Sequence, residues 1–182
     1  MHFCGKIQCM QAPAFSTHEL KDLSFDRFSE KLFNDWYPAA FALLKKIDVT
    51  ARELNEHCSI EGLDVHLNTL AREFECLYHK DKQDLFPLLD HLQHQNTKAE
   101  NCTPFKVVKL HHTAMLEAVK SACDFLDNLF ANDRNIEQIV ILNSLLDEFG
   151  TQAANLQQIK DRGYYRHFKS CKGCSAALNE IV

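Results

Sequence analysis

The chain has 182 residues, of which 46% are hydrophobic and 25% are charged, and its formal net charge is −5. This length and composition are typical of one globular domain with a sizeable core, and the acidic balance without any basic run argues against a nucleic-acid partner. Only 5 Gly and 4 Pro are present, and so few helix breakers favour a mostly helical fold.

Residues 1–22 read as a leader with weak periodicity. The first residues, MHFCGKIQCMQ, hold no apolar run of the kind a signal peptide needs. No stretch reaches the roughly 18 apolar residues that span a bilayer. We therefore expect a cytoplasmic protein without membrane contact, in which most of the 8 Cys are reduced thiols.

Two helices are predicted next, interrupted at residues 34–38 (NDWYP). Ser24 is a candidate N-cap for the first helix, and Pro38 suits the start of the second, which runs to Cys58. Apolar residues at helical spacing predict the inward face of the second helix: Ala40, Leu43, Leu44, Ile47, Ala51 and Leu54. Residues 59–62 read as a turn.

Residues 63–89 predict one long amphipathic helix. Its apolar stripe consists of Leu63, Leu67, Leu70, Phe74 and Leu77. Asp81 falls on the same stripe, where a carboxylate needs a metal, a cation or water as its partner. His79 is expected to face outward. Phe86-Pro87 is expected to end or kink the helix, because proline lacks an N–H and clashes with the preceding turn.

The rest of the chain predicts two more helices. Residues 90–103 are polar and read as a loop, and Thr103-Pro104 is a capped start for a helix that runs to about Phe130. The last helix covers residues 135–161 and is ended by Gly163. The inward stripes of these two helices are Val108, His112, Met115, Val119, Ala122, Leu126 and Leu129, and then Leu142, Leu145/Leu146, Phe149, Ala153, Leu156 and Lys160.

Four long amphipathic helices with short connections predict an all-α fold, an antiparallel four-helix bundle over residues 23–163 with a short N-terminal helix. The leader precedes this bundle, and a Cys-containing tail, residues 164–182, follows it. The two halves look alike as helix pairs, without a convincing sequence repeat.

The phrases LFPLL (85–89), VVKLHHTAML (107–116) and LLDEF (145–149), with their spacing, resemble the hemerythrin-like (HHE) family. The resemblance covers about residues 23–162 and is closest to the di-iron proteins linked to iron–sulfur cluster repair. It implies a di-iron site in the bundle core, and functions that involve oxygen, nitric oxide or iron. The ligands of such a site are single histidines and two His-x-x-x-Glu pairs. In each pair the two side chains can reach the same metal site, because residues four apart share one helical face.

Most ligand positions implied by the resemblance hold other residues here. Only His112 and Asp81 keep the character of a ligand. An alignment shifted by two would place His79 in the first pair, but Leu77 would then leave the apolar stripe. The positions that have lost a ligand are Asn34, Asn55, Leu77, Leu156 and Lys160.

Lysine puts positive charge where the metal would be, so we expect an impaired or absent di-iron site plugged by Leu77 and Leu156. A specific form of this hypothesis is that Lys160 pairs with Asp81. For each remaining candidate ligand a simpler interpretation stays open: His112 is a hydrogen-bonded core histidine, and Asp81 is a solvated residue at a helix end.

The tail holds a second candidate site, Cys171-Lys172-Gly173-Cys174. Together with Cys4 and Cys9 it could complete a zinc site, or it could form a redox-active dithiol whose thiolate Lys172 favours. The alternative is a tail without chemistry.

Three functions therefore remain open: a hemerythrin-like protein of oxygen, nitric oxide, iron or iron–sulfur cluster metabolism, a metal-free bundle that regulates a protein partner, and a thiol or zinc sensor. No catalytic triad, phosphate loop or nucleophile–base pair is recognised, so enzymatic activity is not predicted. The sequence makes no prediction about the oligomeric state.

Overall fold

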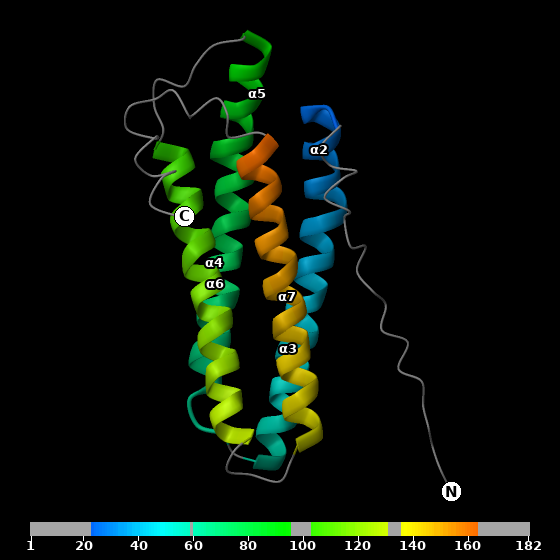
Figure 1. The fold of residues 1–182 in the computed structure, drawn as a ribbon, viewed down its shortest axis with the longest axis vertical. Coiled ribbons are helices and arrows are strands. Elements are labelled where there is room, and N and C mark those ends of the chain that lie inside the picture. Colours follow the sequence, from blue (N-terminus) through cyan, green and yellow to red (C-terminus); the bar gives the residue numbers. More distant parts are fainter. Residues whose placement is uncertain (1–22, 59, 96–102, 131–135, 164–182) are drawn as a thin grey trace, which may run out of the picture.

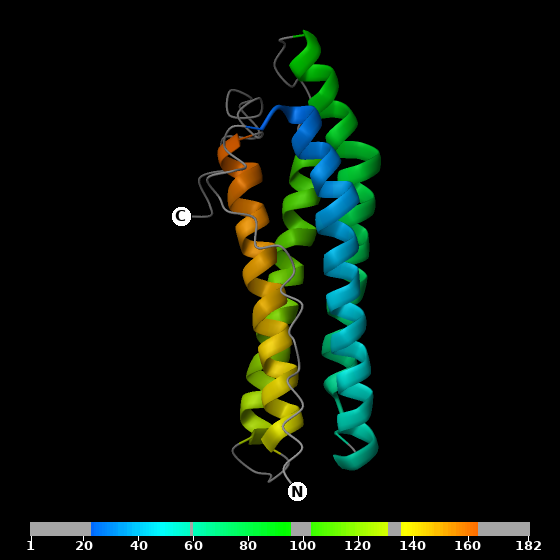
Figure 2. The same ribbon diagram turned by 90° about the vertical axis from the view of Figure 1, so that its right-hand side faces the viewer.

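The computed structural model describes residues 23–58, 60–95, 103–130 and 136–163. The predicted leader, the predicted tail and the candidate site at Cys171 and Cys174 lie outside these ranges. Within them all regular structure is helical and no strand occurs, as the scarcity of Gly and Pro predicts. Four long helical stretches lie side by side along the long axis of the molecule (Figures 1 and 2). None of the described helices has an apolar stretch long enough to cross a membrane.

The first helical stretch consists of α2 (Phe25–Lys31), η1 (Leu32–Trp36) and α3 (Tyr37–Cys58). Ser24 is the N-cap as predicted, since its Oγ accepts a hydrogen bond from the Arg27 N–H at 3.4 Å. The predicted interruption at residues 34–38 is wrong. The chain instead passes through η1, one wide π-helical turn, and continues as a helix beyond Pro38.

The second stretch consists of α4 (Leu63–Lys80), η2 (Asp81–Leu85) and α5 (Phe86–Gln95). Phe86-Pro87 does not end it, and η2 is again a π-helical turn. The predicted loop over residues 90–103 is also corrected, because α5 continues to Gln95 and its Leu92 is buried.

Each π-helical turn is followed by one aromatic residue and then a proline, and this explains how the helices continue. The Tyr37 N–H bonds to the Leu32 carbonyl and the Phe86 N–H bonds to the Asp81 carbonyl, each five residues back. In a regular α-helix the proline ring collides with the carbonyl four residues back, and a wider turn relieves that collision. Each π-helical turn therefore accommodates the proline that follows it.

The remaining helices are α6 (Thr103–Phe130) and α7 (Ile136–Gly163). The predicted inward stripes are confirmed: every predicted position on the four long helices is buried except a few that are only partly buried, Leu44, Leu67, Leu129 and Leu145. His79 faces solvent, as expected. The apolar stripes thus specify one common core that all four stretches share.

The contacts between helices differ in kind. The helix α6 packs closely on both α4 and α7, and α3 packs on α7. Between α3 and α4 the contact is largely aromatic, with the Tyr37 ring centroid 4.9 Å from that of Tyr78 and 5.7 Å from that of Phe74. At the turn joining these two helices, Gly62 has a φ of 103°, a conformation that favours glycine. The buried polar residues are Asp81 on η2, Lys109 and His112 on α6, and Lys160 on α7.

Candidate functional site

A buried polar cluster, Tyr37, Asp81 and Lys160, joins three of the four helical stretches. The Lys160 ammonium and the Tyr37 hydroxyl both donate to Asp81 Oδ2. All three residues are completely shielded from solvent, at 0% exposure. The predicted pairing of Lys160 with Asp81 is confirmed, and Asp81 is not a solvated residue at a helix end.

The two π-helical turns help to place this cluster. Asp81 is the first residue of η2, and Tyr37 directly follows η1. Each wide turn changes the direction in which later side chains point, compared with an uninterrupted α-helix. Lys160 comes from the last turn of α7, close to its end at Gly163. The cluster therefore depends on two irregular turns and one helix end.

Phe86 completes the surroundings of the ammonium group. The Lys160 Nζ lies 5.8 Å from the centre of the Phe86 ring, within the range of a cation–π contact. The second carboxylate oxygen, Asp81 Oδ1, is buried and has no hydrogen-bond partner among the described residues. One negative oxygen, one phenol and one aromatic ring thus surround the buried ammonium.

Tyr37 and Phe86 were missed by reasoning from the sequence, although a signal was present. Residues 34–38 read NDWYP and residues 83–87 read QDLFP. Both pentapeptides consist of an amide, an aspartate, an apolar residue, an aromatic residue and a proline. Both also coincide with a π-helical turn. The aromatic members are Tyr37 and Phe86, so a short internal repeat marks two residues around Lys160.

His112 is a core histidine with its Nε2 in use. It is 3% exposed, and its Nε2 lies 3.0 Å from the Ala153 carbonyl oxygen, to which Nε2–H donates. Burial, followed by the positive charges of Lys160 and Lys109, lowers the pKa of His112 to about 4. The imidazole is therefore neutral at pH 7, and only its Nδ1 is left for a metal.

The other former ligand positions are scattered. Leu77 and Leu156 are buried in the apolar core, Asn34 is exposed, and Asn55 uses its Oδ1 to accept the Ile60 N–H at 2.7 Å. The alternative ligand His79 lies on the surface, with half of its side chain exposed. Nowhere in the described ranges do three or more His, Cys, Asp or Glu side chains gather in a way that could hold a metal.

A second polar contact links the first part of α6 to the end of α7. Lys109 Nζ lies 3.3 Å from Asp161 Oδ1, and the Gln157 side-chain amide donates to the same carboxylate oxygen at 3.1 Å. Lys109 also lies over the Phe105 ring, 5.7 Å from its centre. Unlike Lys160, Lys109 keeps some contact with solvent, at 10% side-chain exposure.

A partly buried hydrogen bond links α4 and α6 through His111, the chain neighbour of His112. His111 Nδ1 lies 2.8 Å from Glu73 Oε2. The hydrogen bond from His111, together with Arg72, lowers the pKa of Glu73 against the opposing effect of burial. The two neighbouring histidines thus serve different contacts, as their separation of about 100° around a helix requires.

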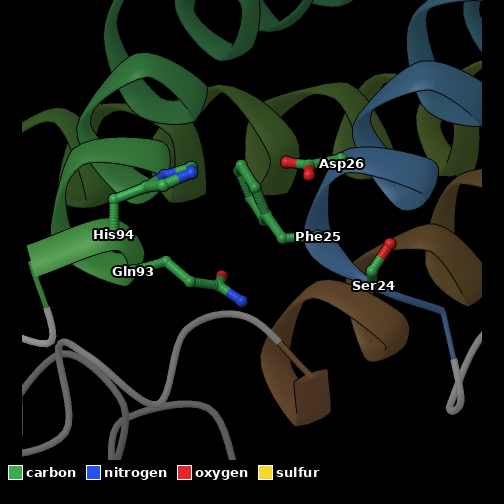
Figure 3. A pocket seen from close by; sticks show the side chains of 5 residues that line it. All are labelled: Ser24, Phe25, Asp26, Gln93 and His94. Carbon is green, nitrogen blue, oxygen red and sulfur yellow. The ribbon is translucent and has the colours of Figure 1, made fainter.

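A small surface hollow of about 140 Å³ lies between the start of α2 and the end of α5. Figure 3 shows Gln93 and His94 on one side and Ser24, Phe25 and Asp26 on the other. The hydrogen bond and charge of Asp90, then the charge of Asp26, raise the pKa of His94. The Ser24 hydroxyl caps α2 by accepting the Arg27 N–H.

No family model, no curated protein and no solved structure matches the chain.

Proposed function

We propose that this chain is a hemerythrin-like protein in which the polar cluster has replaced the di-iron centre, and that it acts by binding a protein partner. The observation that carries the proposal is the ion pair between Lys160 and Asp81, both at 0% exposure. The resemblance places both residues at former ligand positions, and an ammonium group supplies the positive charge that a metal would have supplied there.

The path of the chain supports an antiparallel, hemerythrin-like arrangement. In Figure 1 the colours run down the molecule through α2 and α3, return upward through α4 and α5, descend along α6 and rise again along α7. This order requires only short connections between neighbouring helices. The described residues 23–163 agree in extent with the region of resemblance.

The surroundings of the cluster argue against two irons. A cationic side chain at the centre repels a divalent cation, and buried opposite charges are already neutralised by each other. Leu77 and Leu156 offer no donor atoms, and His112 donates its Nε2–H to Ala153. The residues at the ligand positions that the resemblance implies thus do not fit a di-iron centre.

Metal content tests this part of the proposal. The untagged full-length chain is purified without added metal, incubated with Fe²⁺ under anaerobic conditions, exposed to air and examined by elemental analysis and absorption spectroscopy. We expect no stoichiometric iron and no oxo-bridge bands. About two irons per chain with such bands would overturn the proposal and restore the oxygen, nitric oxide or iron–sulfur repair functions of the family.

Zinc is measured in the same samples, because Cys171, Cys174, Cys4 and Cys9 lie outside the described residues. The matched control is the double variant Cys171→Ser with Cys174→Ser. Zinc that is present in the natural chain and lost in this variant would favour the zinc or thiol sensor instead.

A partner-binding role is supported by large apolar side chains on the surface. Leu110 on α6 is 67% exposed and Val65 on α4 is 62% exposed. We expect that Leu110→Glu loses a partner that the natural chain captures from the cytoplasm, whereas Lys45→Glu, an exposed charge change on α3, retains it. Equal capture by both variants would exclude the surface around Leu110.

A further inference from the structure

We infer that Tyr37, Asp81 and Phe86 form a binding site for a primary ammonium ion, and that the Lys160 side chain occupies this site as an internal ligand. The inference rests on the contacts within the core and does not require kinship with hemerythrins. It concerns a different property from partner binding, namely the chemical class of ligand that the core itself recognises.

The charge and geometry of the site match an alkylammonium group. Asp81 supplies one full negative charge, and its Oδ2 accepts from both the ammonium and the Tyr37 hydroxyl. The phenol holds the carboxylate in place, because a hydrogen bond to a charged acceptor is stronger than one between neutral groups. At 0% exposure the pair is shielded from bulk solvent, which strengthens the attraction.

The Phe86 ring, the second carboxylate oxygen and the nearby leucines explain the preference for an ammonium head on an alkyl stem. The Phe86 ring attracts a cation through its π face, with the Nζ at 5.8 Å. Asp81 Oδ1 is a buried acceptor without a partner among the described residues. It is therefore available to accept a hydrogen bond from a second N–H of a tetrahedral –NH₃⁺ group. Leu77 and Leu156 are buried and lie one helical turn before Asp81 and Lys160, and such apolar side chains suit a hydrocarbon chain.

A metal ion does not suit the same surroundings. Divalent cations require several oxygen or nitrogen donors, and this site offers a single carboxylate. Tyr37 presents a hydroxyl that donates to Asp81, and Phe86 presents no lone pair. An ammonium ion needs one negative partner and acceptors for its N–H groups, which the site supplies.

The test removes the internal ligand and returns it as a small molecule. Lys160→Ala deletes the outer three carbons and the nitrogen of the side chain, which together correspond to n-propylammonium. We expect n-propylammonium to raise the Tm of the full-length Lys160→Ala chain along a saturable curve, by roughly 5 °C at saturation. The Tm of the natural chain, whose site is filled, should not show that curve.

Four matched controls decide whether the site is responsible. Neutral 1-propanol and tetramethylammonium should leave the Tm of Lys160→Ala unchanged at equal concentration, since one lacks the charge and the other lacks N–H groups. The double variant Lys160→Ala with Asp81→Asn should lose the response. Divalent metal chlorides should not replace n-propylammonium.

The inference is overturned if 1-propanol stabilises the variant as well as n-propylammonium does, if the Asp81→Asn double variant responds equally, or if a divalent metal stabilises instead. Should Lys160→Ala not fold alone, its refolding yield with and without n-propylammonium becomes the readout. Lys160→Met then serves as the control that fills the space without charge. A yield that n-propylammonium does not raise would also overturn the inference.

Discussion

Tyr37 and Phe86 stand at the same position of two matching pentapeptides, and they flank the same lysine. Tyr37 reaches Lys160 through the carboxylate of Asp81, whereas Phe86 faces the ammonium group with its ring. Each residue directly follows a π-helical turn. The repeat therefore has a structural meaning: two wide turns direct two aromatic side chains towards one buried cation.

Breaking the ion pair should destabilise the protein more than removing it whole. Lys160→Met leaves the Asp81 carboxylate buried and unpaired, and we expect a loss of roughly 3–5 kcal/mol in the free energy of unfolding. The double variant Lys160→Met with Asp81→Leu should recover a large part of that loss, since no charge then remains buried. Urea unfolding of the two single variants and the double variant measures the coupling, and strictly additive losses would contradict it.

The Tyr37 hydroxyl should contribute to stability through its bond to Asp81. Tyr37→Phe is expected to cost about 1.5–3 kcal/mol, because it removes a buried hydrogen bond to a charged group. The matched control is Tyr78→Phe, whose hydroxyl accepts from the exposed Lys82 at 3.0 Å. That control should change stability by less than about 0.5 kcal/mol. Equal losses in the two variants would show that the cluster is not what makes Tyr37 important.

Replacing Pro87 by alanine should stabilise the protein only slightly. A proline in the interior of a regular helix costs about 3 kcal/mol, so Pro→Ala would normally stabilise by that amount. The π-helical turn η2 already accommodates the Pro87 ring. We therefore expect Pro87→Ala to change the free energy of unfolding by less than about 1 kcal/mol in denaturant melts. A gain near the full cost of a helical proline would mean that η2 remains strained.

Stability should fall as the pH is lowered towards 4, because His112 is held neutral. Its pKa is about 4 in the folded protein, against an ordinary value of 6.5. The unfolded chain binds the proton first, so the loss begins near pH 6.5 and grows until pH 4, reaching about 3 kcal/mol.

His112→Gln, whose amide can still donate to Ala153, should flatten the stability profile between pH 6.5 and 4. Glu73 acts in a lower range, because its lowered pKa gives stability that is lost only as the pH falls below its ordinary 4.5. Unfolding measured at several pH values separates the two residues. A profile for His112→Gln that matches the natural chain would contradict the role of His112.

The fold could be predicted because the apolar residues recur at helical spacing. The stripes from Leu63 to Leu77 and from Leu142 to Leu156 were sufficient to identify the buried faces. The pairing of Asp81 with Lys160 was also predicted, because the family resemblance placed both residues at former ligand positions, where an ammonium group would replace the charge of the metal.

The π-helical turns could not be predicted by a pattern with a fixed period. Proline normally predicts a helix end, and the rule fails at Pro38 and Pro87 because a wide turn precedes each of them. For the same reason Tyr37 was assigned to an interruption and not to the core. The contribution of Phe86 could not be recognised before the position of the Lys160 ammonium was known.

The cluster also has a consequence for synthesis on the ribosome. Asp81 and Lys160 are separated by 79 positions in the chain, and Tyr37 lies a further 44 positions before Asp81. The carboxylate therefore leaves the ribosome long before its counterion has been made. Until the end of α7 emerges, the Asp81 carboxylate lacks its counterion, so the packing of the nascent helices at this level can be completed only after α7 has been made.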